Sequence, residues 1–203
     1  MAITAYLVGL TSFSSPVDRY LRGENVLLTA EVKKGFNLFM GKANCGTCHF
    51  APNFSGLVPP LFDESESEVL GVRINADSLI LDDDLGRYAS GIPSYEAEFY
   101  KHSFKTLSVR NVKFSAPYFH NGGFTSLREV MDFYNNGGGA GRGLDVPYQT
   151  LSADSLNLNE DEINAIISFM EALSDTSNTQ RKPVSLPEWE QEGLETRVLG
   201  GLY

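Results

Sequence analysis

The chain has 203 residues, of which 42% are hydrophobic and 21% charged, a normal globular balance for a domain with a real core. Its net charge of -10 argues against nucleic acid and anionic membrane surfaces as partners and allows a basic protein partner, and no apolar run approaches the roughly 20 residues of a membrane span. Both cysteines lie in one motif, which excludes a disulfide framework and a four-cysteine metal site within one chain.

The first predicted helix covers residues 29–43, TAEVKKGFNLFMGKA, and leads directly into the cysteine motif. Thr29 can cap its start, although the capping box is incomplete because no glutamate stands at the third helical position. Four apolar residues recur at helical spacing and would share one face: Val32, Phe36, Phe39 and Met40.

The segment NCGTCH, residues 44–49, has the spacing that attaches a c-type haem. The thiols of Cys45 and Cys48 would each add to one vinyl group of the porphyrin, and His49 would bind the iron. A thioredoxin-like redox pair would follow a strand pattern, and a zinc site would need further ligands at a recognisable spacing; neither is seen. The motif therefore predicts one covalent haem c and leaves open what fills the second axial position.

The stretch after the motif shows little regular pattern, and we expect long irregular loops there. Residues 51–72 are rich in turn-forming and acidic residues. Further on, Asp82, Asp83 and Asp84 stand in a row. Three adjacent acids are most often a solvated loop, and a calcium site is the alternative, although the spacing of an EF-hand is absent.

A short helix is predicted to start at Ser126, which forms a capping box with Glu129, and to end at the asparagines and glycines from Asn135 onward. Its apolar face carries Met131 and Tyr134, one turn apart. Either side chain can reach the iron on the side opposite the histidine. Chemistry alone favours the methionine, because thioether ligands are ordinary in electron-transfer cytochromes and tyrosine ligation is rarer.

The last predicted helix lies within NEDEINAIISFMEALSD, residues 159–175. Asn159 is a good N-cap, Glu162 completes a box, and three acids fall in the first turn, where the helix dipole favours them. An early helix that ends at the haem motif and a late apolar helix across it are typical of small haem c domains. The sequence thus predicts an all-α, cytochrome-c-like domain with long irregular loops.

From about residue 176 the chain becomes polar and contains Pro183 and Pro187. This composition predicts an irregular C-terminal extension over residues 176–203. The single tryptophan, Trp189, is interpreted as a packing anchor for that extension.

One long run, FKTLSVRNVKFSAPYFHNGGFTSLREVMDFYNNGG at residues 104–138, resembles the bacterial di-haem cytochrome c peroxidase and MauG family. The second domain of that family carries FKxPxLRN, then APYFHDG or APYMHDG, then TLEEVVDFYNxGG. GFNLFMGKANCGTCHFAPNFSG is similar to its haem-attachment segment, and AYLVGLTSFSSPVDRYLRGE to the end of the preceding domain and the linker. The resemblance spans most of residues 5–175. It implies the end of a preceding domain and a linker at 1–24, a cytochrome c domain at 25–175, and the extension after it.

The resemblance also implies site residues. In the family the second axial ligand is a methionine in peroxidases and a tyrosine in MauG-like members, fourteen positions after the histidine of APYFH. Counted from His120, that position is Tyr134, which overturns the chemical preference and makes Met131 the runner-up. The arginine of LRN matches Arg110 and is expected to contact a haem propionate. His120 is carried over only as lining of the haem pocket.

Two positions depart from the family motifs. The proline of FKxP is Leu107 here, and the aspartate of HDG is Asn121. Neither is a proposed iron ligand, so the departures concern loop geometry. A larger departure is that the family has two haems and this chain has one CxxCH.

The function implied by the resemblance is that of the electron-transferring C-terminal half of a di-haem peroxidase or MauG-like oxidoreductase. Its expected partners are the N-terminal haem domain of the same protein and a small redox protein or cytochrome donor. The expected location is the periplasm or another exported compartment. The isolated chain is expected to be inactive, with no catalytic residue of its own. A stand-alone monohaem electron carrier and a haem-free fragment are the alternatives.

Overall fold

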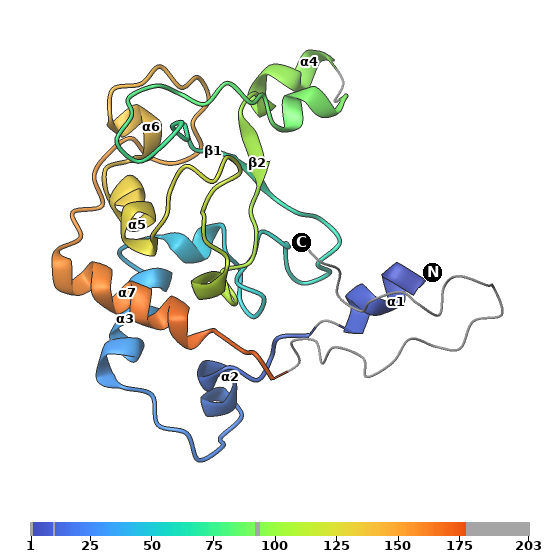
Figure 1. Ribbon diagram of the computed structural model, residues 1–203, viewed down its shortest axis with the longest axis vertical. Coiled ribbons are helices and arrows are strands. Elements are labelled where there is room, and N and C mark those ends of the chain that lie inside the picture. Colours follow the sequence, from blue (N-terminus) through green and yellow to red (C-terminus); the bar gives the residue numbers. More distant parts are fainter. Residues whose placement is uncertain (1, 10, 92–93, 178–203) are drawn as a thin grey trace, which may run out of the picture.

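The computed structural model describes residues 2–9, 11–91 and 94–177. Its helices are α1 (Ala2–Gly9), α2 (Pro16–Leu21), α3 (Ala30–Met40), α4 (Ser94–Ala97), α5 (Leu127–Asn135), α6 (Gly138–Gly141) and α7 (Glu160–Ala172). Four short 3-10 turns interrupt the loops: η1 (Cys45–Thr47), η2 (Arg87–Ser90), η3 (Glu98–Tyr100) and η4 (Val112–Phe114). The strands are β1 (Ser67–Val69) and β2 (Ser103–Lys105). Figure 1 shows α3 beside α7, with α5, α6 and the strands on one side of this pair.

The helix pair α3 and α7 forms the centre of the domain. The two helices approach so closely that a Cβ atom at Gly35 would collide with the carbonyl oxygen of Ala165. Beside this crossing, the rings of Phe39 and Phe169 meet edge to face, with centroids 5.3 Å apart. Both predicted helices are confirmed, since α3 lies within residues 29–43 and α7 starts after the predicted cap at Asn159.

Side chains from several elements complete this core around the helix pair. Met131 of α5 is 3% exposed and packs into it, as do the residues just before the haem motif. The buried members of this main core are Val17, Phe39, Ala43, Phe54, Val109, Leu127, Met131, Leu158, Ile163, Ile166, Phe169, Met170 and Leu173. A second, smaller cluster has Val72, Phe124 and Phe133 at its centre, with Tyr118, Phe119 and Tyr134 against it.

The prediction of an all-α domain is wrong, because β1 and β2 pair as a two-stranded antiparallel sheet. Ser67 pairs with Lys105, and Val69 with Ser103. Each strand has three residues, which is too short for an alternating pattern to show in the sequence. The pairing is also long-range, so no hairpin turn joins the strands and marks them.

The predicted long loops are present between the helices. They are pinned by isolated bridges, such as Arg73 with Leu81 and Tyr118 with Phe124, rather than by extended elements. Side chains also fix them: the Asn121 amide donates to the Arg73 carbonyl over 2.9 Å. Irregular backbone of this kind depends on individual hydrogen bonds.

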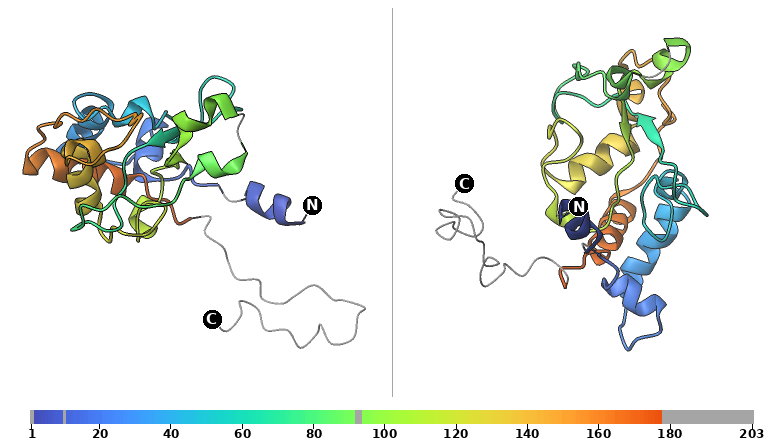
Figure 2. Two further views of the ribbon diagram at one scale, coloured as in Figure 1. Left: turned by 90° about the horizontal axis from the view of Figure 1, so that it is seen from above. Right: turned by 90° about the vertical axis from the view of Figure 1, so that its right-hand side faces the viewer.

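The N-terminal segment before α2 is bound to the end of the domain. The Ser14 amide donates to the Asp175 carboxylate over 2.8 Å, and Asn111 bonds both the Ser12 hydroxyl and the Asp175 amide, at 2.9 and 2.7 Å. We call these four residues the terminal clasp. α1, in contrast, projects from the body of the domain (Figure 2).

The proposed boundaries at 24 and 175 stay predictions. The predicted anchor Trp189 lies outside the described residues, as does most of the predicted extension. In the described part of the chain, no helix combines the length and the apolar character needed to cross a bilayer.

Candidate functional site

The cysteine–histidine motif lies directly after α3 and folds as a single 3-10 turn, η1. The His49 amide donates to the Cys45 carbonyl over 2.9 Å, which winds the motif tightly. Both thiols are free and half-buried, so they are available for thioether bonds. The ring of Phe39, from the preceding helix, lies 6.2 Å from the His49 ring and connects the motif to the main core.

His49 is held in the orientation and protonation state that a metal ligand requires. Its Nδ1 lies 3.2 Å from the Phe54 carbonyl oxygen. A carbonyl only accepts, so this contact favours the tautomer that has its proton on Nδ1 and its lone pair on Nε2. Burial lowers the pKa of His49 and favours the neutral ring, although hydrogen bonds to the backbone at Phe54 and Leu107 and the charge of Glu68 act in the opposite direction. The donor set of two thiols and one oriented imidazole therefore fits a c-type haem.

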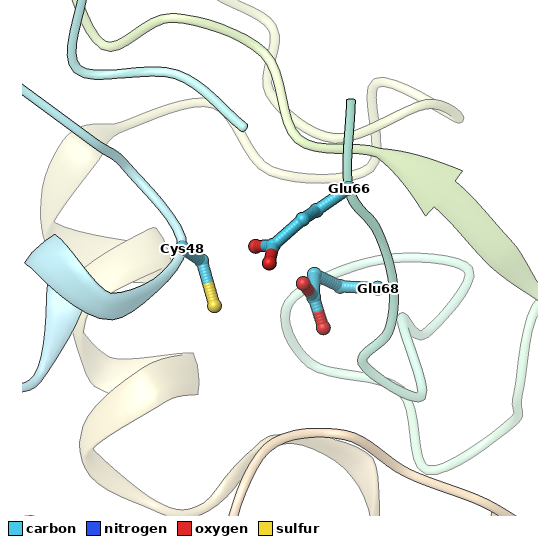
Figure 3. A group of neighbouring side chains, drawn as sticks. All are labelled: Cys48, Glu66 and Glu68. Carbon is cyan, nitrogen blue, oxygen red and sulfur yellow. The ribbon is translucent and has the colours of Figure 1, made fainter. Parts of the chain in front are cut away.

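Two carboxylates that sequence reasoning missed lie beside the second thiol. The Cys48 sulfur and one oxygen each of Glu66 and Glu68 lie within 4.8 Å of one another, as Figure 3 shows. Burial and the charge of Glu68 raise the pKa of the Cys48 thiol to about 11, and burial raises that of Cys45 to about 12. Both thiols are therefore protonated at neutral pH in this fold. No spacing signal predicted the cluster, because the short strand β1 brings the acids to the motif.

Tyr134, on α5, lies on the same side of the domain as the motif. Burial raises the pKa of its phenol above the ordinary value, and the nearby thiols of Cys45 and Cys48 and the carboxylate of Glu68 add to the shift. An electrostatic influence of this kind requires that the phenol and the thiols share one interior region. The Tyr134 ring packs against Phe119, with centroids 6.1 Å apart.

Arg110 is already saturated with partners. Its guanidinium makes a bidentate ion pair with Asp18 of α2, with two contacts of 2.8 Å, and the arginine side chain is 7% exposed. Its remaining donors reach the Pro52 and Ser12 carbonyls. All five N–H groups of the guanidinium are thus used within the protein. A haem propionate would have to displace one of these bonds, and the propionate contact stays a prediction.

His120 lies in a polar and aromatic arrangement of its own. Its ring stacks on Phe104 of β2 with centroids 3.5 Å apart, and its Nε2 lies 3.1 Å from Asp82. Asn121 also donates to Asp82, and this bond, ahead of the one from His120, lowers the pKa of the Asp82 carboxyl. The prediction of a solvated acidic run thus holds for Asp83 and Asp84, which are exposed, and is wrong for Asp82, which is half-buried.

The structure gathers some of the predicted site residues and separates others. Cys45, Cys48, His49 and Tyr134 belong to one region, whereas the hydrogen bonds of Arg110 and His120 go to groups outside it. The runner-up ligand, Met131, lies in the main core.

Similarities to known proteins were found for most of the chain, although no family model matches it. A cytochrome-c peroxidase, IdrP2, of Denitromonas iodatirespirans is 37% identical over 183 residues, covering 83% of this chain and 46% of the relative. The methylamine utilization protein MauG of Methylorubrum extorquens is 30% identical, covering 85% of this chain and 42% of the relative. The chain therefore spans about half the length of the curated relatives it matches.

Solved structures show the same relationship. A MauG-like protein associated with microbial copper homeostasis is 25% identical with a TM-score of 0.61, covering 82% of this chain and 50% of that one. The diheme peroxidase BthA of Burkholderia thailandensis is 21% identical with a TM-score of 0.56, and the match covers 80% of this chain and 46% of BthA. This likeness shows a shared fold.

Proposed function

Because this chain belongs to the family of the bacterial di-haem cytochrome c peroxidases and MauG, we propose that it is the C-terminal haem domain of such an oxidoreductase. The domain would hold one haem c through Cys45 and Cys48, with His49 and Tyr134 as the residues that would bind its iron. When bound, the haem supplies an iron that takes up and releases single electrons. We propose further that the N-terminal haem domain of the whole protein meets peroxide, and that this domain supplies or stores electrons for that chemistry.

The observation that carries the proposal is the oriented imidazole of the motif. The Phe54 carbonyl favours a proton on Nδ1 of His49, and this tautomer would leave the lone pair of Nε2 for iron. A redox-active cysteine pair would not need this arrangement. It would also need a thiol that ionises easily, whereas the pKa of each thiol here is raised well above its ordinary value.

The structure supports Tyr134 over Met131 as the second ligand. Met131 is a buried member of the main core, against which Cys45 also packs, whereas no contact of Met131 with Cys48 or Glu68 is found in the described chain. Tyr134 instead has the thiols of the motif as electrostatic neighbours. A phenolate stabilises ferric iron, so the site would have a low reduction potential and favour higher oxidation states.

The setting of the domain follows from the same proposal. The protein is placed in the periplasm or another exported compartment, and its electron donor is a small redox protein or cytochrome. The net charge of -10 would attract a basic donor.

Haem attachment is the first test. The chain should be exported in cells that have cytochrome c maturation machinery. Its haem should then remain attached during denaturing electrophoresis and stain in the gel. The double variant Cys45→Ala/Cys48→Ala, matured in the same way, is the control and should give an unstained band. An unstained band from the unaltered chain would refute the proposed cofactor.

The axial ligand is tested with two matched variants. Tyr134→Phe should open the site, giving a high-spin ferric spectrum and binding of added cyanide or azide. Met131→Leu keeps the size of a core residue and should leave the spectrum intact. A sulfur-to-iron band in the near infrared of the unaltered protein, or the reverse response of the two variants, would assign the ligand to Met131 instead.

Peroxidase turnover separates this domain from the whole enzyme. With both axial positions filled, the isolated haem-loaded chain should turn over peroxide at a negligible rate compared with the complete two-haem protein. Comparable rates would show that the division between the two domains is wrong.

A further inference from the structure

Arg73 is a buried cation with an unused hydrogen-bonding edge. The residue is 4% exposed and lies in the loop after β1. Its Nη1 donates to the Ser78 carbonyl over 2.9 Å. Its Nε is fully buried and has no acceptor in the described chain, and Nη2 donates no hydrogen bond there either. These two nitrogens form one side of the planar guanidinium.

No anion of the described chain neutralises this charge. Asp77, in the same loop, is exposed and acts on Arg73 only at long range, without an ion pair. Arg142 adds a second positive charge nearby, and burial together with this charge lowers the pKa of Arg73. Buried charges in proteins are normally paired, so an unpaired one indicates a missing partner.

Arg110 differs from Arg73 in its hydrogen-bond partners. Both arginines are buried, but every N–H of Arg110 has a partner and its charge is matched by Asp18. The N–H groups of Arg110 are therefore all used within the described chain, whereas Arg73 has one edge without a partner.

The surroundings of Arg73 link it to the candidate site. Its guanidinium carbon lies 5.6 Å from the centroid of the Phe124 ring, within the range of a cation–π contact. Phe124 packs on Phe119, and Phe119 packs in turn on Tyr134, with centroids 4.7 and 6.1 Å apart. Arg73 and the proposed iron ligand thus contact the same aromatic cluster.

We propose that the free Nε–Nη2 edge of Arg73 is a binding site for a carboxylate. The two parallel N–H groups of this edge match the two oxygens of one carboxylate, and its single negative charge would balance the single buried positive charge. The carboxylate comes either from a propionate of the haem attached at Cys45 and Cys48 or from a small free acid. The first source rests on the proposed function, and the second does not.

The haem-loaded chain tests the first source through its reduction potential. Arg73→Gln removes the positive charge beside the propionate, so the midpoint potential should fall. Arg73→Lys keeps the charge but loses the planar edge, so its midpoint potential should lie between those of Arg73→Gln and the unaltered chain. Arg142→Gln, which removes an exposed charge near the same place, is the matched control and should shift the potential less than one third as much.

The haem-free chain, made as Cys45→Ala/Cys48→Ala, separates the two sources by equilibrium binding. Protoporphyrin IX should bind at least tenfold more tightly than its dimethyl ester, and Arg73→Gln should abolish that preference. If diacid and diester bind equally while succinate raises the melting temperature only when Arg73 is present, the carboxylate is a free acid. Circular dichroism confirms that each variant is folded, and Arg73→Lys replaces Arg73→Gln if the latter does not fold.

The proposal is overturned if the Arg73 variants match Arg142→Gln in potential and lose neither the porphyrin preference nor protection by succinate. A chain that attaches no haem would defeat the proposed function, but the succinate measurement would still decide the site at Arg73.

Discussion

The helix pair α3–α7 and the loops between residues 51 and 125 follow different physical rules. α7 buries a continuous apolar face, whereas of the face predicted for α3 Phe39 is buried and Phe36 and Met40 are exposed. The positions of both helices follow from side-chain periodicity and caps. The loops bury fewer apolar groups and are held by single hydrogen bonds, such as those of Asn121 and Arg110. The loops nevertheless carry Arg73, Glu66 and Glu68, which bring charge toward the site. In this domain, stability is concentrated in the helices and much of the polar chemistry in the loops.

The largest effect should come from removing an aromatic ring of the helix pair. Phe169 is fully buried, so Phe169→Ala should cost about 3–5 kcal/mol of the free energy of unfolding, measured by urea denaturation. Phe104, the half-buried loop-side ring that stacks on His120, is the counterpart, and Phe104→Ala should cost about 1–2 kcal/mol. Equal losses in the two variants would show that the loops contribute as much to the free energy of unfolding as the helix pair does.

Close backbone contacts should give the next effect. A methyl group at Gly35 would collide with the Ala165 carbonyl between two rigid helices, so Gly35→Ala should cost about 3 kcal/mol. A Cβ at Gly123 would lie 2.5 Å from the Ile74 carbonyl, but a loop can yield, and Gly123→Ala should cost about 1 kcal/mol. Gly9→Ala meets nothing within 4 Å and is the control. Thermal unfolding of the three variants decides whether the loops are the softer region.

The ion pair of Arg110 and Asp18 joins a loop to the N-terminal segment and should give a smaller, pH-dependent effect. Burial raises the pKa of Asp18, but hydrogen bonds from Arg110 and Ser15 outweigh it, and the net pKa is below the ordinary value. The stabilisation is therefore present above about pH 4 and is lost as the pH falls through the lowered pKa. At pH 7, Arg110→Gln should cost about 2 kcal/mol, because a buried carboxylate loses its partner.

Denaturation of Arg110→Gln and the unaltered chain at pH 7 and near pH 3 checks this prediction. The difference between the two proteins should begin to shrink at the lower pH, as the pH approaches the lowered pKa of Asp18 and its carboxylate starts to take up a proton. The double variant Asp18→Asn/Arg110→Gln is the control, and its stability should vary less between the two pH values. A difference that is independent of pH would mean that Arg110 acts through its carbonyl contacts alone.

Helix caps should give the smallest effect and separate stability from chemistry. Asn159 and Ser126 each accept a hydrogen bond from a backbone amide, in α7 and α5, at 3.0 and 3.2 Å. Asn159→Ala and Ser126→Ala should each cost about 1 kcal/mol in denaturation. In the haem-loaded protein only Ser126→Ala should alter the absorption spectrum, because α5 carries Tyr134. An altered spectrum in Asn159→Ala would mean that the helix pair also tunes the iron.

The sequence was sufficient to predict the three main helices and the attachment motif, but not the short helices α2, α4 and α6. α3, α5 and α7 were predicted from apolar spacing and from cap residues such as Ser126 and Asn159, since these signals are local. The family resemblance supplied the candidate Tyr134, which lies near the thiols of the motif.

Features that depend on distant contacts could not be predicted. The three-residue strands were missed because their pairing joins residues 67–69 to 103–105, and so were Glu66 and Glu68 beside Cys48. The free edge of Arg73 is visible only once the surrounding side chains are placed. Asp82 was assigned to a solvated loop because nothing local reveals that His120 and Asn121 bond to it.

The terminal clasp has a mechanical consequence. Because the Ser14 amide bonds to Asp175 and Asn111 joins Ser12 to the Asp175 amide, the chain enters and leaves the domain at one point. A pull between residues 11 and 176 would load these few bonds first, before any force reached the turn that holds His49. The same closeness of entry and exit would let a short linker join the two ends in a circular permutant, with new termini opened in a surface loop.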